Sequence, residues 1–194
     1  MSDQHTAMPA PASTTTPAAT PKKKVAKIGL FYGSSTCYTE IAAEKIRDCI
    51  GPEYVVLHNI STSPLSLASN YRYLILGIPT WDYGELQEDW ENHWEQLGQI
   101  DWSSKVVAVY GLGDQIGYPQ WYQDAMGYLW ARVKQLGATT IGEWPTLGYQ
   151  FESSTALTED SEHFVGLALD DESEFELSEE RITLWCQQIM AGFE

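Results

Sequence analysis

The chain of 194 residues leaves room for one domain and an extension, but not for two full domains. Its 11 basic and 27 acidic residues give a formal charge of −16, which would repel the phosphates of nucleic acids and of anionic membranes. We therefore expect neither nucleic acid nor a membrane as a partner, and no apolar run reaches the length of about 18 residues that a membrane span needs.

The first 24 residues differ from the rest in composition. They are rich in Ala, Pro, Ser and Thr and contain no branched aliphatic residue, so they have nothing to bury in a core. We expect residues 1–24 to be a disordered low-complexity tail. The absence of arginine argues against a transit peptide. Residues 25–194, which hold 8 basic and 26 acidic residues, are expected to form the folded domain.

From residue 25 onwards, short apolar runs alternate with amphipathic segments, which is the pattern of βαβ units around a parallel sheet. This predicts an α/β fold, doubly wound, with five strands and helices on both faces. The predicted strands are 25–32, 54–60, 72–78, 105–111 and a last strand split into 139–144 and 164–170. The polar segment 145–163 between the two pieces is predicted to be an insertion, and its role stays open.

Apolar residues at helical spacing predict four helices, each with one buried face. They span 39–50, 86–97, 122–136 and 180–193. The segment 61–71 is rich in Ser and Pro and is expected to form at most a short helix.

The first predicted strand ends in the sequence GSSTCYTE, residues 33–40, and leads directly into a helix. Hydroxyl side chains beside the free backbone N–H groups of a helix N-terminus bind phosphate. The segment lacks the GxxxxGK[ST] pattern and any lysine, so only neutral donors would hold the phosphate. Taken alone, the segment fits an ordinary Ser/Thr-capped helix start better than a phosphate site.

Two further loops follow the third and fourth strands, at the strand ends where open α/β sheets bind ligands. The loop 77–90 contains Trp81 and the loop 111–122 contains Tyr118. Two aromatic side chains on neighbouring loops can hold a flat conjugated ring between them. Beside a phosphate-type loop, they make a ligand site more plausible than any one loop does.

Other chemistries lack the residue spacing that they require. The glycines at 111, 113 and 117 do not have the spacing of a dinucleotide fingerprint. The histidines show no HExxH pattern, and Cys37, Cys49 and Cys186 show no CxxC pattern, so we predict no metal site. The odd cysteine count also argues against a disulfide framework and fits a reducing, cytoplasmic environment.

Together, these three loops resemble those of the flavodoxins, over a match from about Lys27 to Phe193. Residues 34–39 are similar to the family's phosphate loop, and GIPTW and GLGDQIGY are similar to the loops that enclose the flavin of FMN. The split last strand is similar to the long-chain subgroup, and Cys37-Tyr38 to a second, flavodoxin B-like type in bacteria. The resemblance implies the strand order 2-1-3-4-5 and FMN as cofactor. The implied FMN-binding residues are Ser34, Ser35, Thr36, Cys37, Tyr38, Thr39, Pro79, Thr80, Trp81, Asp82, Tyr83, Gly84, Gly111, Leu112, Gly113, Asp114, Tyr118 and Gln120.

Two positions depart from the family's pattern. Cys37 replaces a glycine, so it must tolerate a positive φ or displace one N–H donor. The peptide that changes orientation with redox state in the family corresponds to Asp82-Tyr83, where the absence of glycine should disfavour the flipped form.

The charge pattern favours an electron carrier over an enzyme. Between Tyr73 and Ala131 there are nine acidic residues, and Lys105 is the only Lys or Arg. This field should lower the reduction potential, repel NADPH and attract a basic protein. The resemblance implies a low-potential one-electron carrier, monomeric, that works with partners such as a ferredoxin/flavodoxin NADP reductase and acceptor enzymes. The alternative is a flavodoxin-like FMN enzyme such as an NAD(P)H quinone reductase.

Overall fold

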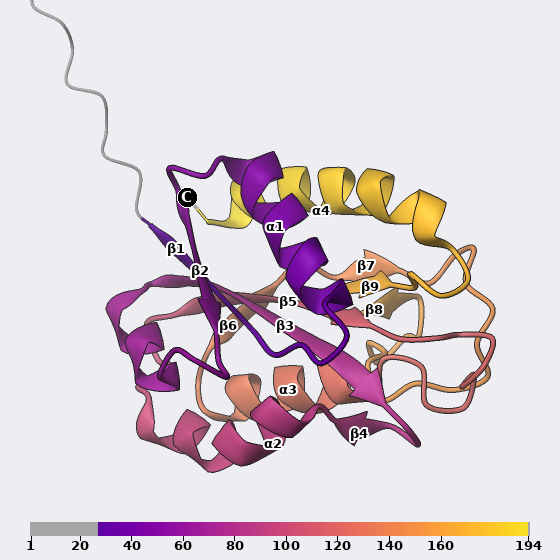
Figure 1. Ribbon diagram of the computed structural model, residues 1–194, viewed down its shortest axis with the longest axis horizontal. Helices are drawn as coiled ribbons and strands as arrows, with labels where there is room; N and C mark the ends of the chain where they lie inside the picture. The colour runs from indigo at the N-terminus through magenta and orange to yellow at the C-terminus, as the bar shows by residue number, and fades with distance from the viewer. Residues whose placement is uncertain (1–26, 194) are drawn as a thin grey trace, which may run out of the picture.

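The computed structural model describes residues 27–193, so the tail expected at 1–24 lies outside the described residues. One central sheet lies between two layers of helices (Figure 1). The predicted α/β class is confirmed by this arrangement.

The central strands are β1 (Ile28–Tyr32), β2 (Val55–Asn59), β3 (Tyr73–Trp81) and β5 (Val106–Leu112), and all are parallel. The sheet order is β2-β1-β3-β5-β6, which is the expected 2-1-3-4-5 order once the short β4 (Glu85–Leu86) is left out of the count. β1 is buried at every position and β5 at six of seven, because helices cover both faces. Continuous apolar runs therefore form the middle of the sheet.

The last strand is split, as the sequence predicts. β6 (Thr139–Ile141) pairs with residues 106–108 of β5, and β9 (Leu167–Leu169) pairs with residues 110–112. Both pieces are shorter than expected. The outer residues instead form a small antiparallel pair, β7 (Trp144–Pro145) with β8 (His163–Phe164).

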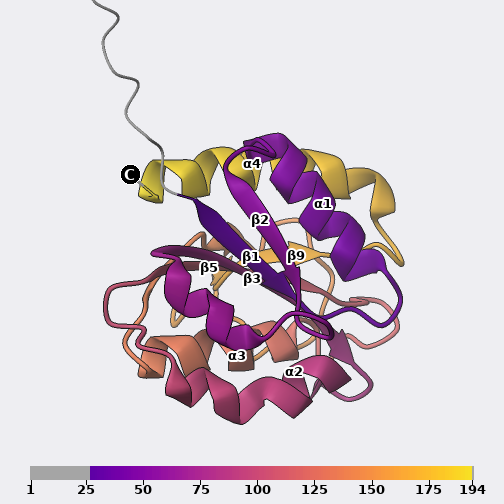
Figure 2. The ribbon, with the colours of Figure 1, turned by 60° about the vertical axis from the view of Figure 1, so that its left-hand side comes forward.

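Helices α1 (Tyr38–Ile50) and α4 (Ser178–Gly192) cover one face of the sheet (Figures 1 and 2). The opposite face is covered by α2 (Glu88–His93), α3 (Asp124–Gln135) and the 3-10 helices η1 (Leu65–Asn70) and η2 (Trp94–Gln99). A further 3-10 helix, η3 (Phe175–Leu177), precedes α4.

The helix predicted at 86–97 is wrong in its form. The segment starts as the strand β4, continues as α2 and tightens into η2. The apolar residues that suggested the helix are nevertheless buried, since Trp90 and Leu97 both lie in the core although the helix is not continuous. Periodicity predicted the buried residues correctly but not the hydrogen-bonding pattern.

The insertion 145–163 packs closely against the domain. Ala156 is fully buried, and Tyr149 and Phe151 pack against the core and against the ring of Tyr122. The Asp124 carboxylate accepts a hydrogen bond from the backbone N–H of Thr155 at 2.7 Å. The insertion thus contributes to the same core as α3.

Candidate functional site

A cleft of about 280 Å³ opens at the carboxyl ends of β1, β3, β5 and β9. All three loops that the sequence singled out contribute to its wall. The lining residues are Thr36, Tyr38, Pro79, Thr80, Trp81, Asp82, Leu112, Gly113, Asp114, Tyr118, Trp121, Tyr122, Asp171 and Glu172. The topology therefore brings together segments that are up to 136 residues apart in sequence, as Thr36 and Glu172 are.

The first loop connects β1 to α1 and ends at Cys37, the N-cap residue of the helix. Cys37 has φ 68° and ψ −13°, so it adopts the left-handed conformation that glycine would take without strain. Among the described residues, α1 receives no side-chain hydrogen bond from its N-cap. Its first N–H groups are therefore available to an anion.

Two polar atoms at this site are buried without a hydrogen-bond partner among residues 27–193. They are the hydroxyl oxygen of Ser34 and the indole nitrogen of Trp81. Leaving such a group unpaired costs about 1–3 kcal/mol, so most buried polar atoms do have partners. A ligand phosphate at the start of α1 would offer an acceptor beside the Ser34 hydroxyl.

The hydroxyl of Ser35 accepts a hydrogen bond from the buried side chain of Gln87. The side-chain amide of Gln87 donates to Ser35 Oγ at 3.2 Å and to Asp89 Oδ2 at 2.7 Å, and its oxygen accepts from the Trp90 N–H. A Cβ on Gly33 would lie 2.2 Å from that oxygen. The phosphate-type loop is therefore tied closely to the start of α2.

The second loop is a tight turn between β3 and β4, because β3 extends three residues further than predicted. The Gly84 N–H donates to the Trp81 carbonyl at 3.1 Å, and Asp82 has φ 43°. Gly84 has φ 90°, and a Cβ there would lie 2.8 Å from the Asp124 carboxylate. Tyr83 is 69% exposed.

The third loop, after β5, is organised by Asp114. Its carboxylate accepts from the N–H groups of Ile116 and Gly117, at 3.0 and 2.6 Å. The turn leaves the Tyr118 ring 44% exposed at the cleft. The side chain of Gln120 points elsewhere, since its amide donates to Glu152 in the insertion at 2.8 Å.

Other predicted site residues also have partners within the protein. Thr39 is buried in the first turn of α1, where its carbonyl accepts from Tyr110. Thr80 lines the cleft, and its hydroxyl accepts from the Ala125 N–H near the start of α3. Gly111 is buried, and a Cβ there would lie 2.1 Å from Gln123. Ser34, Ser35, Cys37, Tyr83 and Gly84 flank the lining residues without belonging to them.

Four lining residues were missed by sequence reasoning: Trp121, Tyr122, Asp171 and Glu172. The last two lie two and three residues after the end of β9, so the rule that ligands bind at strand carboxyl ends could have identified them. Burial raises the pKa of Asp171, while the Ser178 hydroxyl and the Lys45 ammonium lower it in part. Burial also raises the pKa of Tyr122 well above its usual value.

The charged side chains that line the cleft are all acidic. Asp82, Asp114, Asp171 and Glu172 line it, whereas Lys105 lies before the opposite end of β5. The Lys105 ammonium donates to the carbonyls of Ala68, Ser69 and Tyr71. Lys105, the one Lys or Arg between Tyr73 and Ala131, thus has a structural role away from the cleft.

Among residues 27–193, no group of three or more His, Cys, Asp and Glu side chains is placed to hold a metal ion. None of the helices in this range has the length and apolar character needed to cross a bilayer.

Comparison with known proteins agrees with this geometry. The sequence pattern described as "Flavodoxin" matches residues 30–185. The chain is 55% identical to "Flavodoxin 2" of Escherichia coli (strain K12) over 84% of this chain and 94% of the relative. It is 46% identical to "Flavodoxin" of Nostoc sp. (strain PCC 7120 / SAG 25.82 / UTEX 2576), over 86% and 97%. A crystal structure of Fusobacterium nucleatum flavodoxin bound to flavin mononucleotide aligns with a TM-score of 0.82 and 30% identity, over 87% and 99%. The chain belongs to the flavodoxin family.

Proposed function

We propose that this chain binds FMN in the cleft and carries single electrons between other proteins, as an electron-transfer protein rather than an enzyme. The observation that carries the proposal is the meeting of a neutral, donor-rich helix start with two aromatic loops in one cleft. Membership of the flavodoxin family supports the same function. Residues 25–194 form the FMN-binding domain.

The phosphate group of FMN binds at the start of α1. Ser34, Ser35 and Thr36 offer hydroxyl groups there, and Ser34 Oγ is buried without a partner among the described residues. The backbone N–H groups from Cys37 to Thr39 add donors at the positive end of the helix dipole. Donors without charge leave the negative charge of the phosphate unneutralised.

The flavin ring lies between Trp81 and Tyr118, which face the cleft from neighbouring loops. The turn formed by Asp82, Tyr83 and Gly84 and the backbone of Gly113 and Asp114 border the polar edge of the ring. The remaining predicted FMN-binding residues shape these loops; they are Pro79, Thr80, Gly111, Leu112 and Gln120.

FMN supplies the one-electron redox chemistry when it is bound. The chain's own residues exclude water from one side of the ring and surround it with carboxylates. Adding negative charge beside Asp82, Asp114 and Glu172 costs Coulomb energy, and about 1.36 kcal/mol corresponds to about 59 mV for one electron. The reduced protein is therefore a strong reductant.

The electron partners are proteins with a basic surface, such as a ferredoxin/flavodoxin NADP reductase and acceptor enzymes. The formal charge of −16 supports this, because opposite charges speed association and like charges repel NADPH. The chain acts as a monomer in the cytoplasm.

A reductive titration of the FMN-loaded protein, followed by absorbance, tests the proposal. We expect two well-separated one-electron steps and no steady NAD(P)H consumption unless a reductase is added. The rate with the reductase should fall as ionic strength rises. A colourless protein that takes up no FMN, or a single concerted two-electron step, would contradict the carrier function.

A further inference from the structure

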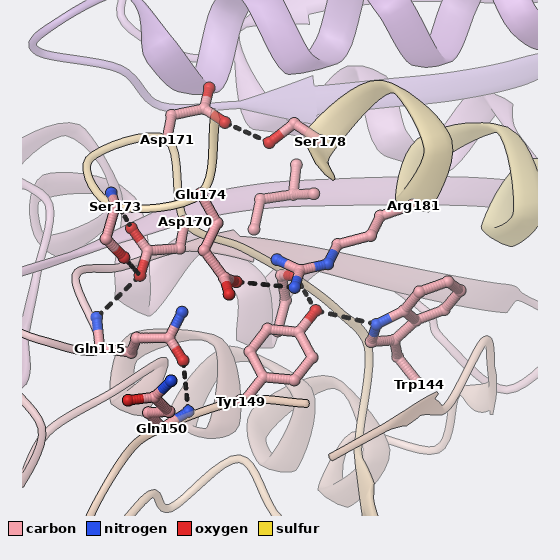
Figure 3. A network of polar contacts seen from close by, with 12 residues as sticks. Gln115, Trp144, Tyr149, Gln150, Asp170, Asp171, Ser173, Glu174, Ser178 and Arg181 are labelled. Carbon is pink, nitrogen blue, oxygen red and sulfur yellow. Dashed lines mark hydrogen bonds and ion pairs between the residues drawn. The ribbon is translucent and has the colours of Figure 1, made fainter. Parts of the chain in front are cut away.

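Asp170 is a fully buried carboxylate just beyond the end of β9, one residue before the cleft (Figure 3). The described residues contain two ion pairs, Arg47 with Asp48 and Arg181 with Glu174, and neither involves Asp170. Burying a carboxylate without a cation is unfavourable unless hydrogen bonds compensate for the lost water. The hydrogen bonds that the Asp170 carboxylate accepts therefore indicate its role in the structure.

Four donors surround this carboxylate. Oδ1 accepts from the backbone N–H groups of Glu172 at 3.2 Å and Ser173 at 2.9 Å. Oδ2 accepts from the Ser173 hydroxyl at 2.6 Å and from the backbone N–H of Gln115 at 3.0 Å. The first three bonds close the turn after β9, and the fourth reaches the loop after β5, 55 residues away in sequence.

The bond to Gln115 fixes the loop that carries Asp114 and Tyr118. On the other side of Asp114, the Gly113 N–H donates to the Leu169 carbonyl at 3.1 Å. Asp114 is thus held on both sides by consecutive residues at the end of β9. Gln115 passes the constraint to the insertion, because its side-chain oxygen accepts from the Gln150 N–H at 2.5 Å (Figure 3).

The turn closed by Asp170 carries two further acidic residues of the lining. Asp171 and Glu172 line the cleft, and Asp171 accepts from the Ser178 hydroxyl at the start of α4. Arg181 of α4 also stabilises the segment after β9, because its guanidinium pairs with the Glu174 carboxylate at 2.7 Å. The same guanidinium lies 4.2 Å from the centre of the Tyr149 ring in the insertion. One buried carboxylate therefore joins two of the three loops that bring acidic side chains to the cleft, the loop after β5 and the turn after β9.

We propose that Asp170 is a positioning residue for the flavin: it holds the loop of Asp114 and Tyr118 in register with the turn of Asp171 and Glu172. The inference rests on the proposed function, because it concerns the same cleft. It predicts that Asp170 acts on the ring end of the ligand and leaves the phosphate end at α1 unaffected.

A role as a mere negative charge predicts the opposite sign. Removing a negative charge near an anionic ligand strengthens binding if charge alone matters. Removing an anchor weakens binding, because the loop must then be ordered when the ligand binds. The direction of the change in FMN affinity therefore separates positioning from simple electrostatics.

Asp170→Asn cuts the link between the loops selectively. The amide oxygen can keep both backbone N–H groups of the turn, and the Ser173 hydroxyl can rotate to accept from the new NH₂ group. The Gln115 N–H then faces a donor and loses its bond. We expect about tenfold weaker binding of both FMN and riboflavin, since one hydrogen bond to a charged group is lost. The visible circular dichroism of the bound flavin should also change.

Two further variants serve as controls. Asp160→Asn makes the same exchange at an exposed carboxylate that accepts from Thr158 and Glu162 within its own turn of the insertion. It should leave both affinities within twofold of the unaltered protein. Asp170→Glu keeps the charge but misplaces it, and it should also weaken both ligands.

The outcomes distinguish this inference from the proposed function. If the unaltered chain binds no FMN, the proposed function fails; if it binds FMN and Asp170→Asn binds as well or better, only the positioning role fails. A loss confined to FMN, with riboflavin unchanged, would also overturn the role. Should Asp170→Asn not fold, amide exchange in the unaltered FMN-free protein decides: protection of the Gln115 N–H supports the anchor, and exchange at free-loop rates overturns it.

Discussion

The lining of the cleft combines two opposite principles. The loop at the start of α1 offers Ser34, Ser35 and Thr36 and contains no lysine, while the loops after β3, β5 and β9 contribute Asp82, Asp114, Asp171 and Glu172. The first, neutral loop is suited to hold an anion with uncharged donors, and the acidic loops oppose added negative charge. Affinity and reduction potential can therefore be adjusted at separate places in one cleft.

The largest effect on flavin affinity should come from removing the aromatic side chains that enclose the ring. Trp81→Ala should weaken binding of FMN and riboflavin by about 3 kcal/mol, because a large apolar contact is lost. Tyr118→Ala should act in the same direction but less, since its ring is 44% exposed. Quenching of flavin fluorescence measures both. Unchanged affinity and potentials in both variants would rule out the enclosure of the ring.

A change in the neutral loop at the start of α1 should affect FMN and riboflavin differently. Thr36→Ala should weaken FMN binding by about 1–2 kcal/mol, because a phosphate oxygen loses a donor. Riboflavin, which has no phosphate, should bind as before. Equal losses for both ligands would show that the phosphate and ring contacts are not separable. The same titration with Trp81→Ala serves as the positive control for a ring effect.

The strained residue of the neutral loop gives a smaller effect on stability. Cys37 has φ 68°, and a non-glycine residue in this region costs about 1–2 kcal/mol. Cys37→Gly should raise the free energy of unfolding of the FMN-free protein by about 0.5–1 kcal/mol, after the greater chain entropy of glycine is subtracted. Urea unfolding measures it. A decrease in stability would mean that the cysteine side chain contributes more than its backbone costs.

The smallest effect concerns Asp171 in the acidic lining and the pH dependence of stability. Burial raises the pKa of Asp171, so the folded protein keeps this proton at a pH where the unfolded chain has lost it. Its contribution to stability is therefore fully present below the unfolded pKa and is lost as the pH rises from that value through the raised pKa of the folded state. Asp171→Asn should remove this fall. Urea unfolding between pH 4 and 7, compared with the unaltered protein, checks the difference, and parallel curves would contradict it.

Much of the fold could be predicted from apolar runs and spacing. β1, β2, β3 and β5 lie inside or beside the predicted segments, because strands buried on both faces show as continuous apolar runs. The extension of β3 to Trp81 was missed, since Pro79 and Thr80 interrupt the run. The pairing that keeps them in the strand comes from β5 and β4, which lie elsewhere in the sequence.

The candidate site was predicted to the level of its loops but not of its hydrogen bonds. Thr36, Trp81 and Tyr118 all line the cleft, because each lies at or beyond the carboxyl end of a parallel strand. The buried partners of these loops, such as Gln87 and Asp170, were not predicted. A polar residue in sequence shows what it can bond to, but its partner is fixed only when distant segments pack.

The split last strand also changes how the sheet ends. An intact parallel edge strand beside β5 would present a long row of unpaired N–H and C=O groups to other molecules. Here that edge consists of two three-residue strands, β6 and β9, and the chain between them turns away into the β7–β8 pair. Another chain would find too few consecutive backbone groups to extend the sheet. The interruption thus makes this edge a poor template for aggregation.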